Sequence, residues 1–299
     1  MSAKAMGAIY GQGFNPSRQA IILAGCDSPH LAAAAAADEM LARTRRRIAI
    51  SVPDQLTLVV TAESEASEPS TQSRGASSPF ARNIVAQPSN RGTAPAILLA
   101  LMRIANQAPA NAVAIFPSDH DLTDDRVFMR HVNFAFSAVE ARPELSVILG
   151  MAALGPECSY GWIEPGPQLS ASDPVRAVRR FVGHAEHRDA IDMMRRGALW
   201  NSFVTVARVS TLLSLIMLAE PELYSAFASI RSAFGTRSET SAVERLYGDI
   251  GHVDFSSGVL AGCPVNLAVL PVNGVAFRSV LASTATVVPA RPPLATAVA

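Results

Sequence analysis

A buried strand that ends on an acidic residue is the feature that most constrains the fold of this chain. Residues 112–116 (AVAIF) are all apolar, and residues 117–120 (PSDH) follow them directly. A short, continuous apolar run predicts a strand inside a sheet. Ligands of open α/β sheets bind just beyond the carboxyl ends of strands, so Asp119 is well placed to hold a divalent metal over a phosphate. The alternative is an aspartate that caps the next helix.

Strand-like and helix-like segments alternate up to residue 150. The predicted strands are residues 19–24, 56–61, 83–86, 112–116 and 145–150, and the predicted helices are residues 32–47, 95–106 and 124–142. This alternation predicts an α/β fold with a mixed, mainly parallel sheet flanked by helices. Beyond residue 150 the pattern becomes α+β, with strands predicted at residues 161–164, 175–182, 200–207, 253–255 and 266–271 and helices at residues 189–196 and 209–218.

Composition narrows the class of protein. The 299 residues carry no net charge and only 6% are aromatic, which argues against nucleic acid or an anionic membrane as partner. Three widely spaced cysteines form neither a disulfide framework nor a zinc motif, and no apolar run reaches transmembrane length. The N-terminus lacks the apolar run of a signal peptide, so we expect a cytoplasmic protein. Residues 63–78 are rich in Ser, Glu and Gly, which predicts a loop.

Residues 87–95 (QPSNRGTAP) precede a predicted helix. Their glycine, threonine and backbone amides are suited to contact a base or phosphate at the helix N-terminus. Taken alone, this segment favours the alternative, which is an ordinary loop and cap with Pro95 in the first helical turn.

Two later segments combine aromatic and polar residues. Residues 160–164 (YGWIE) place Gly161 between two aromatics, and Glu164 is suited to accept sugar hydroxyls. A β-bulge with packed aromatics explains the same pattern equally well. In residues 199–202 (LWNS), Asn201 offers both donors and acceptors to a sugar hydroxyl, or it satisfies a buried turn.

Taken in order, seven short segments resemble the mannose-1-phosphate guanylyltransferase (GDP-mannose pyrophosphorylase) family of sugar nucleotidyltransferases. They are residues 21–25, 90–95, 116–120, 160–164, 199–202, 253–256 and 267–272. The resemblance implies a Rossmann-like (GT-A-like) nucleotidyltransferase domain. We expect it to span residues 19–287, with flexible termini at residues 1–18 and 288–299.

The family transfers a guanylyl group from GTP to mannose 1-phosphate, releases pyrophosphate and uses Mg²⁺. The resemblance therefore implies GTP, mannose 1-phosphate or GDP-mannose as ligands, and a homodimer or an active paralogue as protein partner. It implies that Asp119 is a catalytic metal ligand. It also implies nucleotide-binding residues, namely Leu23, Ala24, Gly25, Gln87, Gly92 and Thr93, and sugar-binding residues, namely Gly150, Tyr160, Gly161, Glu164 and Asn201.

The chain departs from the family where the triphosphate should bind. The family's glycine-rich loop has a Gly-Thr-Arg-Leu core followed by a Pro-Lys pair, whereas residues 26–31 here are CDSPHL. Pro29 removes one backbone amide from this loop. Lys4 is the only lysine of the chain. Residues 183–185 (GHA) stand in place of Glu-Lys-Pro, and Ser279 stands in place of the second metal-binding aspartate.

These departures predict weak or lost activity. Losing one such contact costs about 2.7–4 kcal/mol, roughly 10²–10³ in rate, so three or four losses leave little turnover. One alternative is a catalytically degenerate homologue that binds sugar nucleotide or an active paralogue as a regulatory or structural subunit. A decayed copy that keeps only the scaffold is the third hypothesis.

Overall fold

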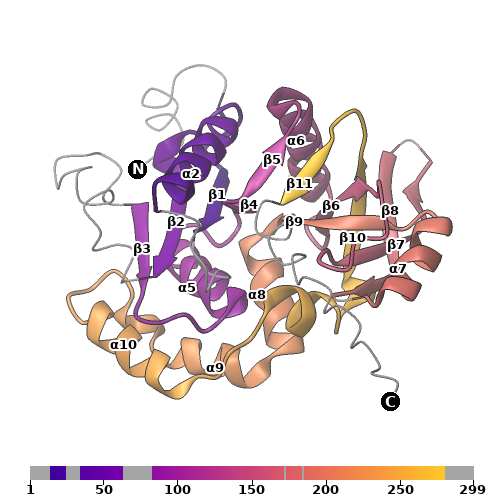
Figure 1. Ribbon diagram of the computed structural model, residues 1–299. Coiled ribbons are helices and arrows are strands. Elements are labelled where there is room, and N and C mark those ends of the chain that lie inside the picture. Colours follow the sequence, from indigo (N-terminus) through magenta and orange to yellow (C-terminus); the bar gives the residue numbers. More distant parts are fainter. Residues whose placement is uncertain (1–13, 25–33, 63–82, 172, 184, 280–299) are drawn as a thin grey trace, which may run out of the picture.

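A computed structural model describes residues 14–24, 34–62, 83–171, 173–183 and 185–279 (Figure 1). The strands are β1 (Arg18–Leu23), β2 (Thr57–Ala62), β3 (Ile84–Gln87), β4 (Ala112–Pro117), β5 (His120–Leu122), β6 (Ser146–Ala152), β7 (Trp162–Ser170), β8 (Asp173–Val182), β9 (Leu199–Arg208), β10 (Leu267–Val272) and β11 (Phe277–Ser279). The α-helices are α2 (Ala34–Ile48), α5 (Thr93–Ala105), α6 (Asp125–Ala141), α7 (His187–Arg195), α8 (Val209–Ala219), α9 (Pro221–Ser229) and α10 (Glu239–Asp249). The other helical turns are η1 (Asp54–Leu56), η3 (Arg231–Ala233), η5 (Pro264–Asn266) and the π-helix η4 (Phe255–Leu260).

Nine of these strands form one sheet in the order β3-β2-β1-β4-β9-β6-β10-β8-β7. The pairs from β3 to β4 are parallel, as is the pair of β10 with β6, and β9 is antiparallel to β4, β6 and β7. Strands β5 and β11 form a separate two-stranded sheet. The predicted α/β fold with a mixed sheet and flanking helices is therefore confirmed.

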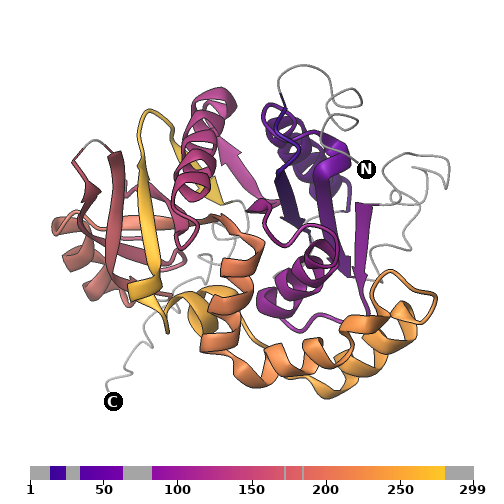
Figure 2. The ribbon, with the colours of Figure 1, turned by 180° about the vertical axis from the view of Figure 1, so that it is seen from behind.

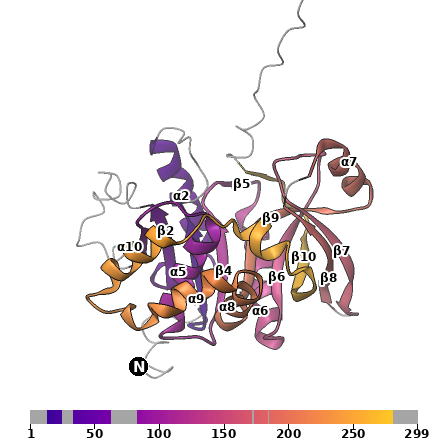
Figure 3. The same cartoon turned by 90° about the horizontal axis from the view of Figure 1, so that it is seen from below.

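Alternation along the central strands explains why helices cover both faces. In β1, Ile21 and Leu23 belong to the core cluster that contains α5 and α8, whereas Ala20 and Ile22 belong to the cluster that contains α6. Figure 2 shows the same arrangement from behind, and α8, α9 and α10 follow one another along the lower edge in Figure 1. Seen from below, the β7–β8 hairpin and α10 lie at opposite ends of the molecule (Figure 3). Among the described helices, none is both long and apolar enough to cross a membrane.

Strand order brings the predicted site residues to one edge of the sheet. After β1 the chain adds β2 and β3 on one side and then returns to place β4 on the other side, which makes a topological switch point at the carboxyl ends of β1 and β4. Strand β6 runs in the same direction as β4 because both are antiparallel to β9. The carboxyl ends of β1, β3, β4 and β6 and the amino end of β9 therefore share this edge.

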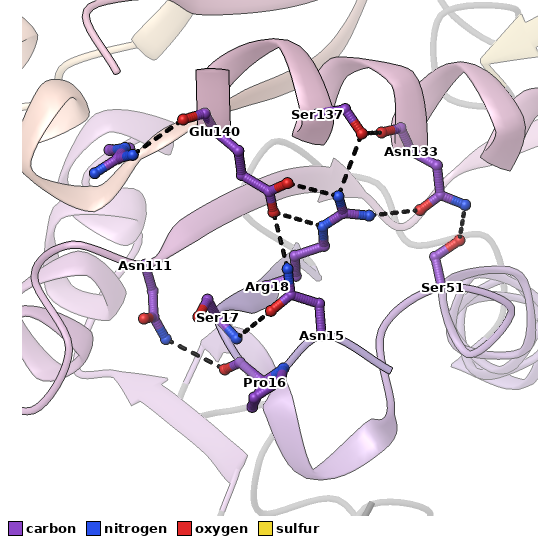
Figure 4. Close-up of polar contacts among 10 residues, drawn as sticks. Asn15, Pro16, Ser17, Arg18, Ser51, Asn111, Asn133, Ser137 and Glu140 are labelled. Atoms are coloured by element: carbon purple, nitrogen blue, oxygen red, sulfur yellow. Dashed lines mark hydrogen bonds and ion pairs between the residues drawn. The ribbon is translucent and has the colours of Figure 1, made fainter. Parts of the chain in front are cut away.

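A polar network fixes the opposite edge, where β1 begins (Figure 4). The Arg18 guanidinium donates to both carboxylate oxygens of Glu140 on α6, at 2.7 and 2.8 Å, and lies 5.1 Å from the centre of the Phe136 ring. Asn15 also donates to Glu140, at 3.1 Å. The described part of the predicted N-terminal tail is thus attached to α6, whereas residues 1–13 and 280–299 lie outside the described residues.

The strand predicted at residues 253–255 is wrong. The Asp254 carboxylate accepts from the amide of Ser257 at 2.7 Å and so caps the π-helix η4. The amide of Val253 donates to the carbonyl of Arg91, and the carbonyl of Val253 accepts from Ala94, both at 3.0 Å. Because both backbone groups of Val253 are bonded to the start of α5, this segment cannot join the sheet. Helices α9 and α10 and the β5–β11 pair were not predicted.

Candidate active site

Asp119 lies in the turn between β4 and β5 and is only 6% exposed. The turn lies beside the end of β1, because Leu23 pairs with Pro117 and the carbonyl of Leu23 accepts from the amide of Ser118 at 3.1 Å. The alternative role as a helix cap is excluded, since α6 is capped by Asp124, whose carboxylate accepts from Val127 at 2.9 Å. The structure therefore brings Asp119 and Leu23 together, with Ala24 directly after β1; Gly25 lies outside the described residues.

Arginines of α2 and β11 contact residues that follow Asp119. Arg47, 2% exposed, donates to the carbonyl of His120 at 3.0 Å and contacts the Asp125 carboxylate at 2.6 Å. Arg43 and Arg278 both approach the carboxylate of Asp121, at 3.2 and 3.6 Å. No role was predicted for these arginines, because sequence spacing alone does not show that α2 and β11 lie next to the turn after β4.

His120 is buried beside this group. Burial is the main cause that lowers its pKa from 6.5 to about 4; the Asp119 carboxylate opposes this shift and the Arg47 guanidinium adds to it. The imidazole packs edge-on against Phe277, with ring centres 4.8 Å apart. It is therefore neutral at pH 7 and adds no positive charge to the site.

The buried neutral histidine makes stability depend on pH. A pKa that is lower in the folded state than in the unfolded state contributes stability that is complete above about pH 6.5 and is lost as the pH falls toward 4. Between pH 7 and pH 5 we expect wild type to lose about 2 kcal/mol more unfolding free energy than the His120→Gln variant. Urea unfolding at both pH values measures this difference. The same replacement at the exposed His187 should leave the wild-type pH dependence unchanged, and parallel profiles for wild type and His120→Gln would contradict the expectation.

Three of the residues predicted to bind the nucleotide, Gln87, Gly92 and Thr93, lie next to residues 247–255. The buried Thr93 hydroxyl donates to the Asp254 carboxylate at 2.9 Å and accepts from the amide of Phe255 at 2.7 Å. Gln87 is buried and accepts from the Tyr247 hydroxyl at 3.1 Å. Gly92 is the N-cap residue of α5. Part of the ordinary loop-and-cap alternative is thus present, and contact with a nucleotide stays a prediction.

Three of the predicted sugar-binding residues meet at the same edge. Gly150 pairs with Asn201 in the β6–β9 register, and the amide of Asn201 donates to the carbonyl of Gly161 at 2.7 Å. A Cβ on Gly161 would lie 3.3 Å from that of Asn201, and one on Gly150 would lie 2.6 Å from Leu199 Cδ1. Both glycines therefore allow β6, β7 and β9 to approach one another closely. This close approach sets the position of Asn201.

The other two predicted sugar-binding residues differ in their surroundings. The Tyr160 ring packs against Trp200 at 4.9 Å and Phe277 at 5.3 Å, so it is joined through Phe277 to His120. These contacts support the packed-aromatics alternative for this segment. Glu164 forms an ion pair with Arg196 at 2.8 Å on the β7 side.

The π-helix η4 connects the predicted nucleotide-binding residues with the predicted sugar-binding residues. The sequence did not predict this role of η4. Its cap, Asp254, bonds to Thr93 on the predicted nucleotide side, and its Ser256 hydroxyl accepts from the Asn201 amide at 3.4 Å on the predicted sugar side. Single π-helical turns occur often at functional sites. Residues 253–256 belong to a segment that carries the family resemblance, and this was the only signal for them in the sequence.

Comparison with known proteins identifies the family of the chain. A family model described as "Nucleotidyl transferase" matches residues 27–252. The relatives include the mannose-1-phosphate guanylyltransferase RfbM of Salmonella typhimurium (33% identical over 151 residues, 49% of this chain and 30% of the relative). They also include the alginate biosynthesis protein AlgA of Pseudomonas fluorescens (29% identical over 144 residues, 48% and 29%). These alignments span less than a third of the relatives' length.

Solved structures share the fold. A Thermus thermophilus protein described as a mannose-1-phosphate geranyltransferase matches with a TM-score of 0.74 at 21% identity, covering 88% of this chain and 76% of that protein. A mannose-6-phosphate isomerase from Helicobacter pylori matches with a TM-score of 0.68 at 16% identity, covering 87% and 99%. At these identities the likeness shows the fold alone. Because the family model spans well over half of its residues, the chain belongs to the nucleotidyl transferase family.

Proposed function

We propose that this chain is a mannose-1-phosphate guanylyltransferase-like protein that binds GTP, mannose 1-phosphate and GDP-mannose, with weak or lost guanylyl transfer. One observation carries the proposal. The carboxyl ends of β1, β3, β4 and β6 and the amino end of β9 share one edge of the sheet. The described candidate residues of these strands lie along this edge, together with Asp119 just after β4. Ligands of open α/β sheets bind at such an edge.

The described residues suit Mg²⁺ only where the substrate supplies the remaining ligands. Within the described ranges no three His, Cys, Asp or Glu side chains gather to hold a metal ion. Asp119 contributes one buried carboxylate. Mg²⁺ in nucleotide sites is often held by one or two carboxylates together with substrate phosphates and water. When bound, the ion would neutralise charge on the triphosphate, and Asp119 is the residue that would hold it.

The remaining residues of the site bind and orient. The side-chain amide of the buried Asn201 donates to the Ser256 hydroxyl, the backbone amide of the same residue donates to the carbonyl of Gly161, and the side-chain amide is the candidate partner for a sugar hydroxyl. The start of α5 is held by Asp254 and Val253, which keeps the predicted nucleotide side fixed relative to η4. Positioning of this kind supplies a large part of the rate in phosphoryl-type transfer.

The register of β11 supports the proposed weakness. Ser279 is the Cα partner of His120 in the β5–β11 pair and therefore lies one residue along the ladder from Asp119. The family resemblance assigns the second metal-binding aspartate to this position, so a serine here leaves one carboxylate where the family has two. Charge on the triphosphate would be less well neutralised, and turnover would fall.

Replacing Asp119 tests the proposal directly. With Mg²⁺, GTP and mannose 1-phosphate, we expect slow pyrophosphate release from wild type and at least a 100-fold lower rate from Asp119→Asn, because a charged ligand is lost. The matched control is Asp124→Asn, which alters only the cap of α6. Equal rates for wild type and Asp119→Asn would reject the assigned role. Absence of both turnover and GDP-mannose binding by calorimetry would reject the function.

A second function is favoured by Ser279 and the altered residues 26–31. In this case the chain binds GDP-mannose without turnover and serves as a regulatory or structural subunit of an active paralogue. Calorimetry that detects GDP-mannose binding in a sample without pyrophosphate release would distinguish it from the enzyme, and co-purification with a co-expressed paralogue would test the partner.

A further inference from the structure

We propose that Thr44 and Arg47 of α2 are positioning residues that fix the backbone on both sides of Asp119 and so hold its carboxylate ready for a divalent cation. The inference rests on the proposed role of Asp119 as a cation ligand. It adds a pair of residues, far away in sequence, on which that role depends.

The contacts place one hydrogen bond on each side of Asp119. The Thr44 hydroxyl donates to the carbonyl of Ser118 at 3.1 Å, and the Arg47 guanidinium donates to the carbonyl of His120 at 3.0 Å. Thr44 and Arg47 are three residues apart and therefore lie on the same face of α2. Both residues are buried, so water does not readily replace either bond.

Arg47 is also anchored at its other side. Its Nε donates to the Asp125 carboxylate at 2.6 Å, in the first turn of α6, so the guanidinium joins α2, α6 and the Asp119 turn. Burying an arginine is costly, and an apolar residue of similar size often gives a more stable protein. Arg47 is buried, paired and bonded to the carbonyl of His120. It is therefore better explained by the position that it gives to the Asp119 turn than by a gain in stability.

The neighbouring sheets also restrain the turn, since His120 is paired with Ser279 of β11. In the described chain the amide of Ser118 is bonded to Leu23 of β1, and the carbonyls before and after Asp119 are those that α2 engages. Removing a group that orients a metal ligand through hydrogen bonds typically weakens metal affinity 10–100-fold. Loss of either α2 contact should therefore loosen Asp119 without removing its carboxylate.

The test measures Mn²⁺ binding to the full chain by electron paramagnetic resonance, with and without GTP. We expect Thr44→Val and Arg47→Met to weaken Mn²⁺ binding about 10-fold or more. Thr44→Ser keeps the hydroxyl and should stay close to wild type. Arg45→Met removes the same charge from the same helix, where Arg45 pairs with Asp54 at 3.6 Å, and should also stay close to wild type. Circular dichroism confirms that each variant is folded, and Thr44→Val decides the test if Arg47→Met is not.

The outcomes separate this inference from the proposed function. Wild-type Mn²⁺ affinity in Thr44→Val, alongside loss of binding in Asp119→Asn, would overturn the inference and leave the proposed function standing. Equal weakening by Thr44→Ser and Thr44→Val would also overturn it, because the hydroxyl would then not matter. Wild-type binding that is absent or insensitive to Asp119→Asn would reject the cation role of Asp119 and the inference together.

Discussion

The Gly92→Ala variant is expected to lose roughly 4 kcal/mol of unfolding free energy, because both its backbone and its surroundings require glycine. Gly92 has φ +88° and ψ 178°, a region that is open almost only to glycine. A Cβ there would overlap the carbonyl oxygen of Val253 and lie 2.8 Å from its carbonyl carbon. These are backbone atoms, so the contact cannot be relieved by a side-chain rotation, and residues 252–255 would have to move.

Gly197→Ala is the matched control for this variant. Gly197 also has a positive φ, +75°, but a Cβ on it would meet no atom within 4 Å. Its replacement should cost only about 1–2 kcal/mol, the price of the backbone conformation alone. Urea unfolding of both variants measures the difference. A Gly92→Ala variant no less stable than Gly197→Ala would show that the approach of Val253 to the start of α5 is not tight.

Hydrogen bonds explain why the Gly92 effect should extend to the site. The neighbouring Thr93 hydroxyl is bonded to Asp254 and Phe255, and Asp254 caps η4. Displacing residues 252–255 would therefore move η4 and, with it, Ser256 and its contact to Asn201. The expected stability loss should be accompanied by weaker GDP-mannose binding if the predicted nucleotide and sugar residues are used as proposed.

Local patterns were sufficient to predict the central strands. The apolar run at residues 112–116 became β4, and its residues belong alternately to the core cluster that contains α5 and to the one that contains α6. A continuous apolar run carries this information because a central strand is covered on both faces. The position of Asp119 at the end of β4 followed from the same run, since it depends only on residues next to it in the chain.

Contacts between distant segments were not predictable in this way. Residues 253–255 alternate apolar and acidic residues as a short strand does, but their backbone partners, residues 91–94, are more than 150 positions away. Arg47 looks like a surface residue at the basic end of a helix, and only the packing of α2 against the turn after β4 makes it buried. The part of the site that was missed, Arg47 and Asp254, therefore depends on tertiary contacts rather than on local pattern.

Ser279→Asp is expected to strengthen divalent cation binding about 10-fold or more and to raise pyrophosphate release, by up to about 10²–10³ if the cation limits the rate. The backbone register makes this position informative, because Ser279 pairs with His120 next to Asp119. A second carboxylate at this point would give Mg²⁺ the pair of acidic ligands that the family resemblance assigns. Ser279→Asn adds a side chain of nearly the same size without charge and is the matched control.

Mn²⁺ affinity and pyrophosphate release separate the possible causes of weak turnover. Stronger Mn²⁺ binding together with faster release would identify the missing carboxylate as the main defect. Stronger binding with unchanged release would place the defect in the remaining departures, residues 26–31 and 183–185, to which the family resemblance assigns phosphate binding. No gain in affinity over Ser279→Asn would mean that residue 279 does not face the cation, and the resemblance would then not extend to the second metal ligand.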